Sequence, residues 1–277
     1  MNFYTTILGS GAAVPTLIRH CSAQVVNVNG FRLLLDCGEG TQNQVRAFHQ
    51  KMQSISLICI SHLHGDHFFG LPGLLSTMHL CGRTEPVDIV APKGLKEILD
   101  RMFEYSNSEP DFEIRIHELE GETTEMVFEN KRCRVTAFPL LHSVPTWGYS
   151  IDEVPRGNNP QRRYVYCSDT AYTESILPMI EGANLLCLEC TFADDFASVA
   201  DAKLHLTASR AAMLAQKGHV GQLLLTHFSA RYKTVDPMLQ QASSLFPNTL
   251  AANDGEIFQV NYFQEPTQVE PDELKAE

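Results

Sequence analysis

The sequence has little positive charge and no long apolar run. Its 277 residues include 21 Lys and Arg against 33 Asp and Glu, which gives a net charge of −12. Because phosphate contacts supply most nucleic-acid affinity, this balance excludes a generally basic surface that wraps nucleic acid, and any polyanion would need a local basic patch. No apolar stretch reaches the length that crosses a bilayer, so we expect no membrane partner.

We also expect neither a secretory leader nor a disulfide framework. The opening MNFYTTILGSGAAVP has no basic region and no cleavage signal, which favours a cytoplasmic location. The eight cysteines are scattered, and several lie in strand-like runs such as LICI, where a reduced thiol packs as a small apolar group. Cys187 and Cys190 have C-x-x-C spacing, but their strand-like context favours two buried, reduced thiols.

Short apolar strands alternate with amphipathic helices along the chain. The runs NFYTTILG, SAQVVNVNG and FRLLLDCG predict three opening strands, with Asn29-Gly30 as a hairpin turn. Later strand-like runs such as SISLICIS and VGQLLLTH alternate with helical patterns such as GLKEILDRMFEYS. We therefore expect one α/β domain of two sheets with helices outside over residues 1–262. An acidic, disordered tail is expected over 263–277.

The segment SHLHGDH concentrates metal-binding side chains. It places His62, His64, Asp66 and His67 within six residues, directly after an apolar strand. Imidazole nitrogens and carboxylate oxygens suit borderline divalent metals such as zinc. His62 and His64 can grip one ion from an extended loop, while Asp66 and His67 turn toward a second ion, with Gly65 permitting the bend. The alternative, a histidine-rich surface loop or a helix capped by Asp66, fits a fourfold pattern poorly.

Further candidates follow other strand ends. His142, Asp169, Glu189 and His227 each stand at the end of an apolar strand run. In layered α/β folds the loops at such ends converge to build a site. Each residue alone is more often structural or solvated. Together, His142, Asp169 and His227 supply what two adjacent ions need, with a carboxylate such as Asp169 bridging both.

These segments together resemble a known family. SHLHGDH, LLH, SDT, LTHFSARY, LGSGAAVPT and LLLDCGEGTQ are similar to the metallo-β-lactamase fold. Within that fold, DCGEGTQ, HGDHFFGLPGLL and HFSARY most resemble the ribonuclease Z group, the tRNA 3′-end-processing endonucleases. The resemblance covers residues 1–262 and implies a four-layer αββα sandwich, a metal-dependent phosphodiesterase or endoribonuclease, and a homodimer.

The resemblance also implies a role for individual residues. A hydroxide held between two zinc ions would attack phosphorus, Asp66 would accept the proton of the attacking water, and the Glu189–His205 pair would protonate the leaving oxygen. Asp36 would orient a metal-bound imidazole. Manganese or iron also suits such ligands. The ions would be held by His62, His64 and His142 on one side and Asp66, His67 and His227 on the other, with Asp169 bridging. Substrate contacts would come from Arg231, Tyr232 and Arg19.

Several of these roles stay open on the residues alone. A strand-end glutamate such as Glu189 is usually solvated, and a histidine before a helix, such as His205, is usually a cap. Asp36 has the alternative of an ordinary turn aspartate. An exposed arginine such as Arg231 is as often solvated or structural as ligand-binding.

Two departures from the family bear on the substrate. The family carries a long arm rich in Gly, Pro and basic residues between the strands that correspond to WGYSIDEV and YVYCSDT, whereas this chain has only PRGNNPQRR there. The loop LIRHCSA has Leu17 where a basic residue is usual and His20 where asparagine is usual, and only Arg19 fits. The short connection retains three arginines: Arg156, Arg162 and Arg163.

Three functions therefore compete. The first is a dizinc phosphodiesterase of the ribonuclease Z type, which cleaves the 3′ trailer of tRNA precursors. The second is the same chemistry on a small phosphodiester, cyclic nucleotide or sulfate ester, which the missing arm and the acidic charge favour. The third is a metal-binding sensor module without turnover, against which the intact Asp66 and Glu189 argue.

Overall fold

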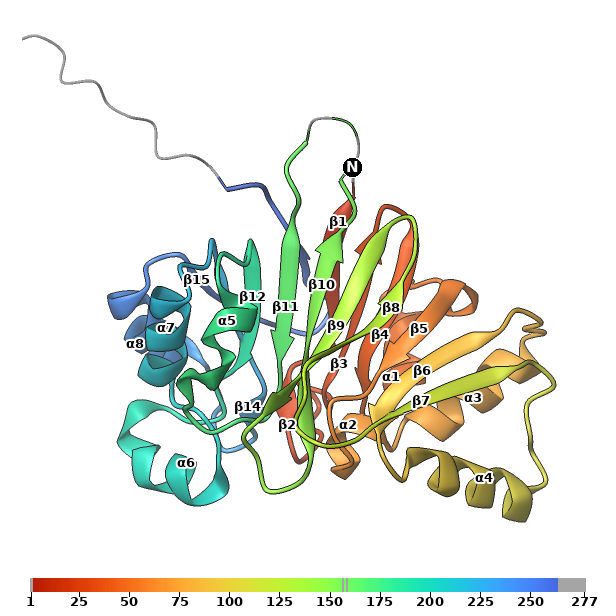
Figure 1. Cartoon of the computed structure of the whole chain (residues 1–277). Coiled ribbons are helices and arrows are strands. Elements are labelled where there is room, and N and C mark those ends of the chain that lie inside the picture. The colour runs from red at the N-terminus through yellow and green to blue at the C-terminus, as the bar shows by residue number, and fades with distance from the viewer. Residues whose placement is uncertain (1, 156, 158, 264–277) are drawn as a thin grey trace, which may run out of the picture.

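The structure, a computed structural model, describes residues 2–155, 157 and 159–263. Within that part of the chain, two seven-stranded mixed sheets lie face to face and helices cover their outer faces (Figure 1). The αββα sandwich expected from the sequence is confirmed. Of the predicted tail, only Phe263 is described, and residues 264–277 lie outside the described residues. The domain boundary at 262 therefore stays a prediction.

The first sheet has the strand order β16-β1-β3-β4-β5-β6-β7. Strands β16, β1, β3 and β4 pair antiparallel, and β4 to β7 pair in parallel. Asn29 and Gly30 close the β3–β4 hairpin with φ of 52° and 95°, as a two-residue turn of this sequence requires. The strands are β1 (Phe3–Gly9), β3 (Ala23–Val28), β4 (Phe31–Cys37), β5 (Ile55–Cys59), β6 (Val87–Pro92), β7 (Ile114–Leu119) and β16 (Ile257–Gln259).

The second sheet repeats this plan in the order β15-β13-β12-β11-β10-β9-β8. Strands β8 to β11 pair antiparallel, and β11, β12, β13 and β15 pair in parallel. A short parallel pair of β2 (Gly11–Ala12) and β14 (Phe228–Ser229) ties the opening loop to the segment after β13. The strands are β8 (Glu125–Glu129), β9 (Cys133–Leu140), β10 (Thr146–Glu153), β11 (Arg163–Cys167), β12 (Leu185–Glu189), β13 (Leu223–Thr226) and β15 (Thr249–Ala251).

Helices form the outer layers because each buries one apolar stripe against a sheet. The first sheet packs against α1 (Thr41–Ala47), α3 (Leu71–Leu80) and α4 (Leu95–Ser106). The second packs against α5 (Leu177–Ile180), α7 (Ala208–Lys217) and α8 (Asp236–Leu245). The remaining short helices are α2 (Gly65–Phe68), α6 (Ala197–Lys203) and the 3-10 turns Met52–Ser54, Glu174–Ile176 and Asp194–Phe196.

The core between the sheets contains three fully buried tyrosines whose hydroxyls are all paired. Tyr149 donates to the Ile60 carbonyl at 2.7 Å, Tyr164 to Gln24 Oε1 at 2.5 Å and Tyr166 to Asp36 Oδ2 at 2.6 Å. A buried hydroxyl without a partner costs about 1–3 kcal/mol, so these bonds make the polar atoms tolerable in an apolar layer. The bond of Tyr166 also ties this core to the candidate site.

All eight cysteines are free, and all but Cys81 are buried. Burial raises the pKa of the Cys187 thiol to about 11, which keeps it protonated and unreactive near neutral pH. Over the residues that the structure describes, no helix is long and apolar enough to cross a membrane.

Thr6 in β1 offers a test of the packing. Its hydroxyl is buried, and no described group pairs with it. Replacing Thr6 with valine removes this hydroxyl, keeps the branched shape and favours a strand, so the free energy of unfolding should rise by about 1 kcal/mol. Chemical denaturation at equilibrium measures the change. A fall in stability would mean that the Thr6 hydroxyl has a partner in solution.

Candidate metal centre

Strand ends from both sheets meet at one edge of the sandwich. β11, β12 and β13 are parallel neighbours, so the residues that follow them lie together. β9 runs in the same direction two strands away, which brings His142 to the same edge. The loop after β5 supplies His62 to His67 from the facing sheet. The topology therefore brings the strand-end residues singled out in the sequence to one edge of the sandwich.

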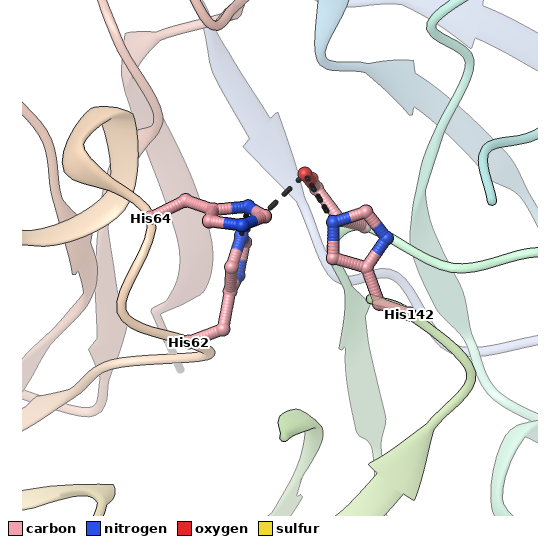
Figure 2. A group of neighbouring side chains, drawn as sticks. His62, His64 and His142 are labelled. Carbon is pink, nitrogen blue, oxygen red and sulfur yellow. Dashed lines mark hydrogen bonds and ion pairs between the residues drawn. The ribbon is translucent and has the colours of Figure 1, made fainter. Parts of the chain in front are cut away.

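Four of the predicted ligands form a first group. The ligand atoms of His62, His64, His142 and Asp169 all lie within 4.8 Å of one another. His62 Nε2 is 3.0 Å from His64 Nδ1. Figure 2 shows the three imidazoles pointing toward a common space, with His142 approaching from the side opposite to His62 and His64.

The other predicted ligands form a second group beside the first. Asp66, His67 and His227 have ligand atoms within 4.8 Å of one another. Asp66 Oδ2 is 3.3 Å from His67 Nε2 and 3.5 Å from His227 Nε2. Its position is fixed by the backbone N–H of Ala13, which donates to Oδ2 at 2.7 Å. The opening loop thus helps to hold a side chain of the cluster.

Asp169 divides its two carboxylate oxygens between the groups. Oδ2 is 3.5 Å from His62 Nε2 and 3.6 Å from His142 Nε2, both in the first group. Oδ1 is 3.4 Å from His67 Nε2 and 3.1 Å from His227 Nε2, both in the second. A carboxylate in this position can serve two adjacent cations, one through each oxygen.

The spacing of these atoms fits a metal with nitrogen and oxygen ligands. Ligands bound tetrahedrally to zinc at about 2.0–2.1 Å lie about 3.3 Å from one another. The pairs given above fall between 3.0 and 3.6 Å. The donor set of imidazoles and carboxylates suits zinc, manganese or iron. The residues present therefore fit two such cations.

The charges of the site favour cations as well. Burial alone would lower the pKa of His67, but the carboxylates of Asp169, Asp66 and Asp36 outweigh it and raise that pKa well above its usual value. The three carboxylates therefore create a negative potential that stabilises a positive charge at this point of the site. Burial is the largest cause that lowers the pKa of His62 and of His142, which favours the neutral imidazole that binds metal.

Asp36 lies behind the second group, where the sequence predicted an orienting carboxylate. It is fully buried, and its Oδ2 accepts hydrogen bonds from His67 Nδ1 at 2.7 Å and Tyr166 at 2.6 Å. Ser61 donates its backbone N–H to Oδ1 and its hydroxyl to Oδ2. With Nδ1 donating to Asp36, the lone pair of His67 Nε2 is left for a cation.

Replacing Asp36 with asparagine should weaken metal binding. The asparagine amide would turn N–H groups toward donors that now bond to the Asp36 carboxylate. His67 would therefore lose the hydrogen-bond acceptor that sets its tautomer. Partners of this kind are worth about 10–100-fold in metal affinity. Competition with a colorimetric zinc chelator measures the loss. An Asp36→Asn protein that retains its metal like the wild type would show that Asp36 supports only the fold.

Glu189 and His205 form a pair beside both groups. Glu189 is fully buried at the end of β12, and its Oε1 lies 2.8 Å from His205 Nδ1. Burial alone would lower the pKa of His205, but Glu189 raises it to about 9, which keeps a proton on the ring at neutral pH. A ring nitrogen of His205 also lies within 4.8 Å of ligand atoms of Asp169 and His227. The pair can therefore deliver a proton beside the centre.

The predicted substrate contacts divide into two kinds. Arg231 is exposed, and its guanidinium lies 4.8 Å from the Phe192 ring and 4.7 Å from the Phe196 ring, a packing that orients its N–H groups. Tyr232 accepts from the backbone N–H of Ala193 at 3.0 Å. Arg231 is thus the more available of these two for a ligand.

The Arg19 guanidinium is committed to protein groups. Nη1 donates to Ser10 Oγ at 2.6 Å and to the Ala252 carbonyl at 2.7 Å, and Nη2 donates to Asn253 Oδ1 at 2.7 Å. It also packs over the Phe228 ring at 4.8 Å. The structure therefore gives Arg19 a role in fixing the opening loop, and it does not bring the guanidinium into either group of ligands.

Three neighbours of the centre were not predicted from the sequence: Ser61, Tyr166 and Thr191. Ser61 and Tyr166 hold Asp36, as described above. Thr191 Oγ1 lies 2.9 Å from His227 Nδ1 and 2.6 Å from Glu189 Oε2. In the sequence, the only signal for these three residues is that each has a hydroxyl group and lies near the end of a strand that contains or is followed by a candidate site residue.

Comparison with known proteins identifies the family. A family model described as the Beta-lactamase superfamily domain matches residues 31–228. The ribonuclease Z of Azobacteroides pseudotrichonymphae is 37% identical over 279 residues, which cover 91% of this chain and 96% of that protein. The ribonuclease Z of Bacteroides fragilis is 35% identical over 295 residues, with 91% and 97% covered.

A solved structure agrees with these relatives. The crystal structure of human tRNase Z, short form, matches with a TM-score of 0.82 and 32% identity over 94% of this chain and 100% of that chain. The resemblance noted in the sequence is thus confirmed. The chain belongs to the beta-lactamase superfamily and, within it, to the ribonuclease Z family of metallohydrolases.

Proposed function

We propose that this protein hydrolyses RNA phosphodiester bonds and that its substrate is the 3′ trailer of tRNA precursors. The observation that carries the proposal is the bridging position of Asp169 between two groups of ligands, with the Glu189–His205 pair beside them. Ribonuclease Z relatives at 35–37% identity and human tRNase Z at 32% support the substrate.

The chain's own residues divide the work of hydrolysis. Two zinc ions, or manganese or iron in their place, would be held by the two groups and would supply charge neutralisation at the phosphate and activation of a water. Asp66, held by Ala13, accepts the proton that this water loses as its oxygen bonds to phosphorus. His205 gives its proton to the leaving oxygen as the P–O bond breaks, and Glu189 stabilises the protonated ring.

A cavity beside the metal centre can receive the substrate. It has a volume of about 830 Å³, and His142 and Thr173 form part of its wall together with residues 119–122 and 139–147. The Arg231 guanidinium packs against the Phe192 and Phe196 rings, and the Phe192 ring lies 6.0 Å from the His205 ring. An arginine oriented in this way suits a phosphate oxygen. The scissile phosphate would lie between this cavity and Arg231, over the candidate metal ligands.

The short connection between β10 and β11 favours a second candidate, a small phosphodiester, cyclic nucleotide or sulfate ester. Arg162 forms a buried two-bond ion pair with Glu153, at 2.7 and 2.8 Å, and Arg163 pairs with Asp152 at 2.7 Å. These guanidiniums are therefore neutralised and contribute little to a basic RNA track. The third arginine expected there, Arg156, lies outside the described residues.

Cleavage assays separate the candidates. Purified enzyme with zinc or manganese should cut a precursor tRNA carrying a 3′ trailer and leave the mature end. Turnover of bis-p-nitrophenyl phosphate without RNA cleavage would replace the first candidate by the second. Metal-loaded protein that is inactive on every ester would instead support the sensor module. A truncated precursor that lacks the tRNA elbow is the control, because it tests how the enzyme recognises its substrate without the long arm of the family.

Two further parts of the proposal concern assembly and location. We propose a homodimer, as the family resemblance implies, and the loop after β2 supports it because Val14, Leu17 and Ile18 are 61%, 100% and 67% exposed. Analytical ultracentrifugation tests the dimer, with Leu17→Lys expected to weaken it. Eight free cysteines suit a reducing compartment, and on that ground we propose the cytoplasm.

A further inference from the structure

Thr191 lies between the metal centre and the Glu189–His205 pair. It stands two residues beyond Glu189, the last residue of β12, and only 4% of it is exposed. Its hydroxyl oxygen is 2.9 Å from Nδ1 of His227, a predicted ligand, and 2.6 Å from Oε2 of Glu189. One hydroxyl therefore contacts both halves of the proposed catalytic site.

The direction of these two hydrogen bonds follows from the partners. A hydroxyl has a single proton, and a carboxylate oxygen can only accept, so Thr191 donates to Glu189 Oε2. The hydroxyl then presents a lone pair to His227, whose Nδ1 must donate. A neutral imidazole carries one proton, so Nε2 of His227 keeps its lone pair.

That lone pair points where a cation would bind. His227 Nε2 is 3.1 Å from Asp169 Oδ1 and 3.5 Å from Asp66 Oδ2. The opposite tautomer, with the proton on Nε2, would turn a donor toward the same space and could not ligate. The acceptor at Nδ1 therefore decides whether His227 can act as a ligand.

The second bond acts on the proton-donating pair. Five donors reach the Glu189 carboxylate: the N–H groups of Thr170, Thr191 and Leu206, the Thr191 hydroxyl and His205 Nδ1. The hydroxyl bond, at 2.6 Å, is the shortest of them. Together with the N–H groups of Thr191 and Leu206 it holds Oε2, while Oε1 accepts from the Thr170 N–H and lies 2.8 Å from His205 Nδ1.

We propose that Thr191 is a positioning residue that serves both halves of the site at once. It sets the tautomer of the ligand His227 and anchors the carboxylate that orients His205. The second role rests on the proposed function, whereas the first is a statement about metal binding alone. The two roles therefore call for two separate measurements.

The first measurement is metal affinity without substrate. Thr191→Val keeps the branched shape but removes the hydroxyl, so His227 Nδ1 loses its acceptor. One of the two zinc equivalents should pass to a competing chelator about 10–100-fold more readily than in the wild type. Thr191→Ala, which adds no new bulk, should behave in the same way. Thr191→Ser keeps the hydroxyl and should hold both equivalents like the wild type.

The second measurement compares two substrates at zinc concentrations that fill both sites. An RNA leaving group needs a proton, whereas p-nitrophenolate leaves without one. Thr191→Val should therefore lose about tenfold more kcat on precursor tRNA than on bis-p-nitrophenyl phosphate, since its Glu189–His205 pair is less well held. Thr191→Ser should remove this difference.

Thr6→Val is the matched control, because it makes the same change at a buried hydroxyl in β1 that has no described partner. It should alter neither measurement. Wild-type metal affinity in both Thr191→Val and Thr191→Ala would overturn the inference, as would a failure of Thr191→Ser to restore it. If the wild type binds two metals but cleaves no RNA, the proposed function fails, while the chelator comparison still decides the role of Thr191 at His227.

Discussion

Asp169→Asn should bind one metal equivalent instead of two and lose nearly all activity. An asparagine keeps the shape of the side chain, but its single oxygen can face only one group of ligands. The amide NH₂ then occupies the position of the second carboxylate oxygen. It faces the other group, which is either His67 and His227 or His62 and His142. Losing the bridge removes several kcal/mol of transition-state stabilisation, so kcat/KM should fall by roughly 10³-fold or more.

Elemental analysis of the purified protein and cleavage of precursor tRNA measure the two effects. Asp152→Asn is the control, since it removes the same charge from a largely buried aspartate in β10 that pairs with Arg163. Asp152 lies six residues along that strand from Thr146, about 20 Å from the end that faces the site. It should keep both metals and full activity. Two equivalents of metal in Asp169→Asn would contradict the bridging role.

The candidate ligands stand out in the sequence because their signals are local. His62, His64, Asp66 and His67 stand within one loop, and a fourfold pattern at that spacing rarely has another cause. Asp169 needed two further signals, its place after an apolar strand and the family resemblance. The division of its two oxygens between the groups depends on the distance between the sheets, which no local pattern contains.

The role of a residue is harder to predict from the sequence when its partner is distant along the chain or joined to it only by folding. The sequence indicates available positive charge at Arg19, Arg162 and Arg163. In the fold, each guanidinium is hydrogen-bonded or ion-paired to other protein groups. The carbonyl that accepts from Arg19, that of Ala252, is 233 residues away in the chain. Thr191 is the converse case, since a common hydroxyl gains its importance only when His227 folds against it.

The secondary structure shows the same limit. The pattern TQNQVRAFHQKM predicts a helix over 41–52, but α1 ends at Ala47, because His49 adopts a positive φ of 54° that a helix cannot continue. The helix α8 was not predicted, although Pro237 in its first turn is a usual signal of a helix start. Strands β15 and β16 have three residues each, and their pairing with β13 and β1 defines them more than any periodicity does.

His205→Asn should separate RNA from an activated ester. If His205 protonates the leaving oxygen, its loss should reduce kcat on precursor tRNA by about 10²–10⁴-fold, the usual contribution of a general acid. The ribose oxygen that leaves is a strong base and needs the proton. A p-nitrophenolate does not, so kcat on bis-p-nitrophenyl phosphate should fall by less than about tenfold.

The comparison of the two substrates matters more than either rate alone. A purely structural loss, or a loss of metal, would reduce both rates by the same factor. His219→Asn is the matched control, because His219 also pairs through Nδ1 with a glutamate, Glu181 at 3.1 Å, but on the exposed surface. It should leave both rates unchanged. Equal losses on RNA and on the activated ester in His205→Asn, with both metals still bound, would show that His205 orients the centre and transfers no proton.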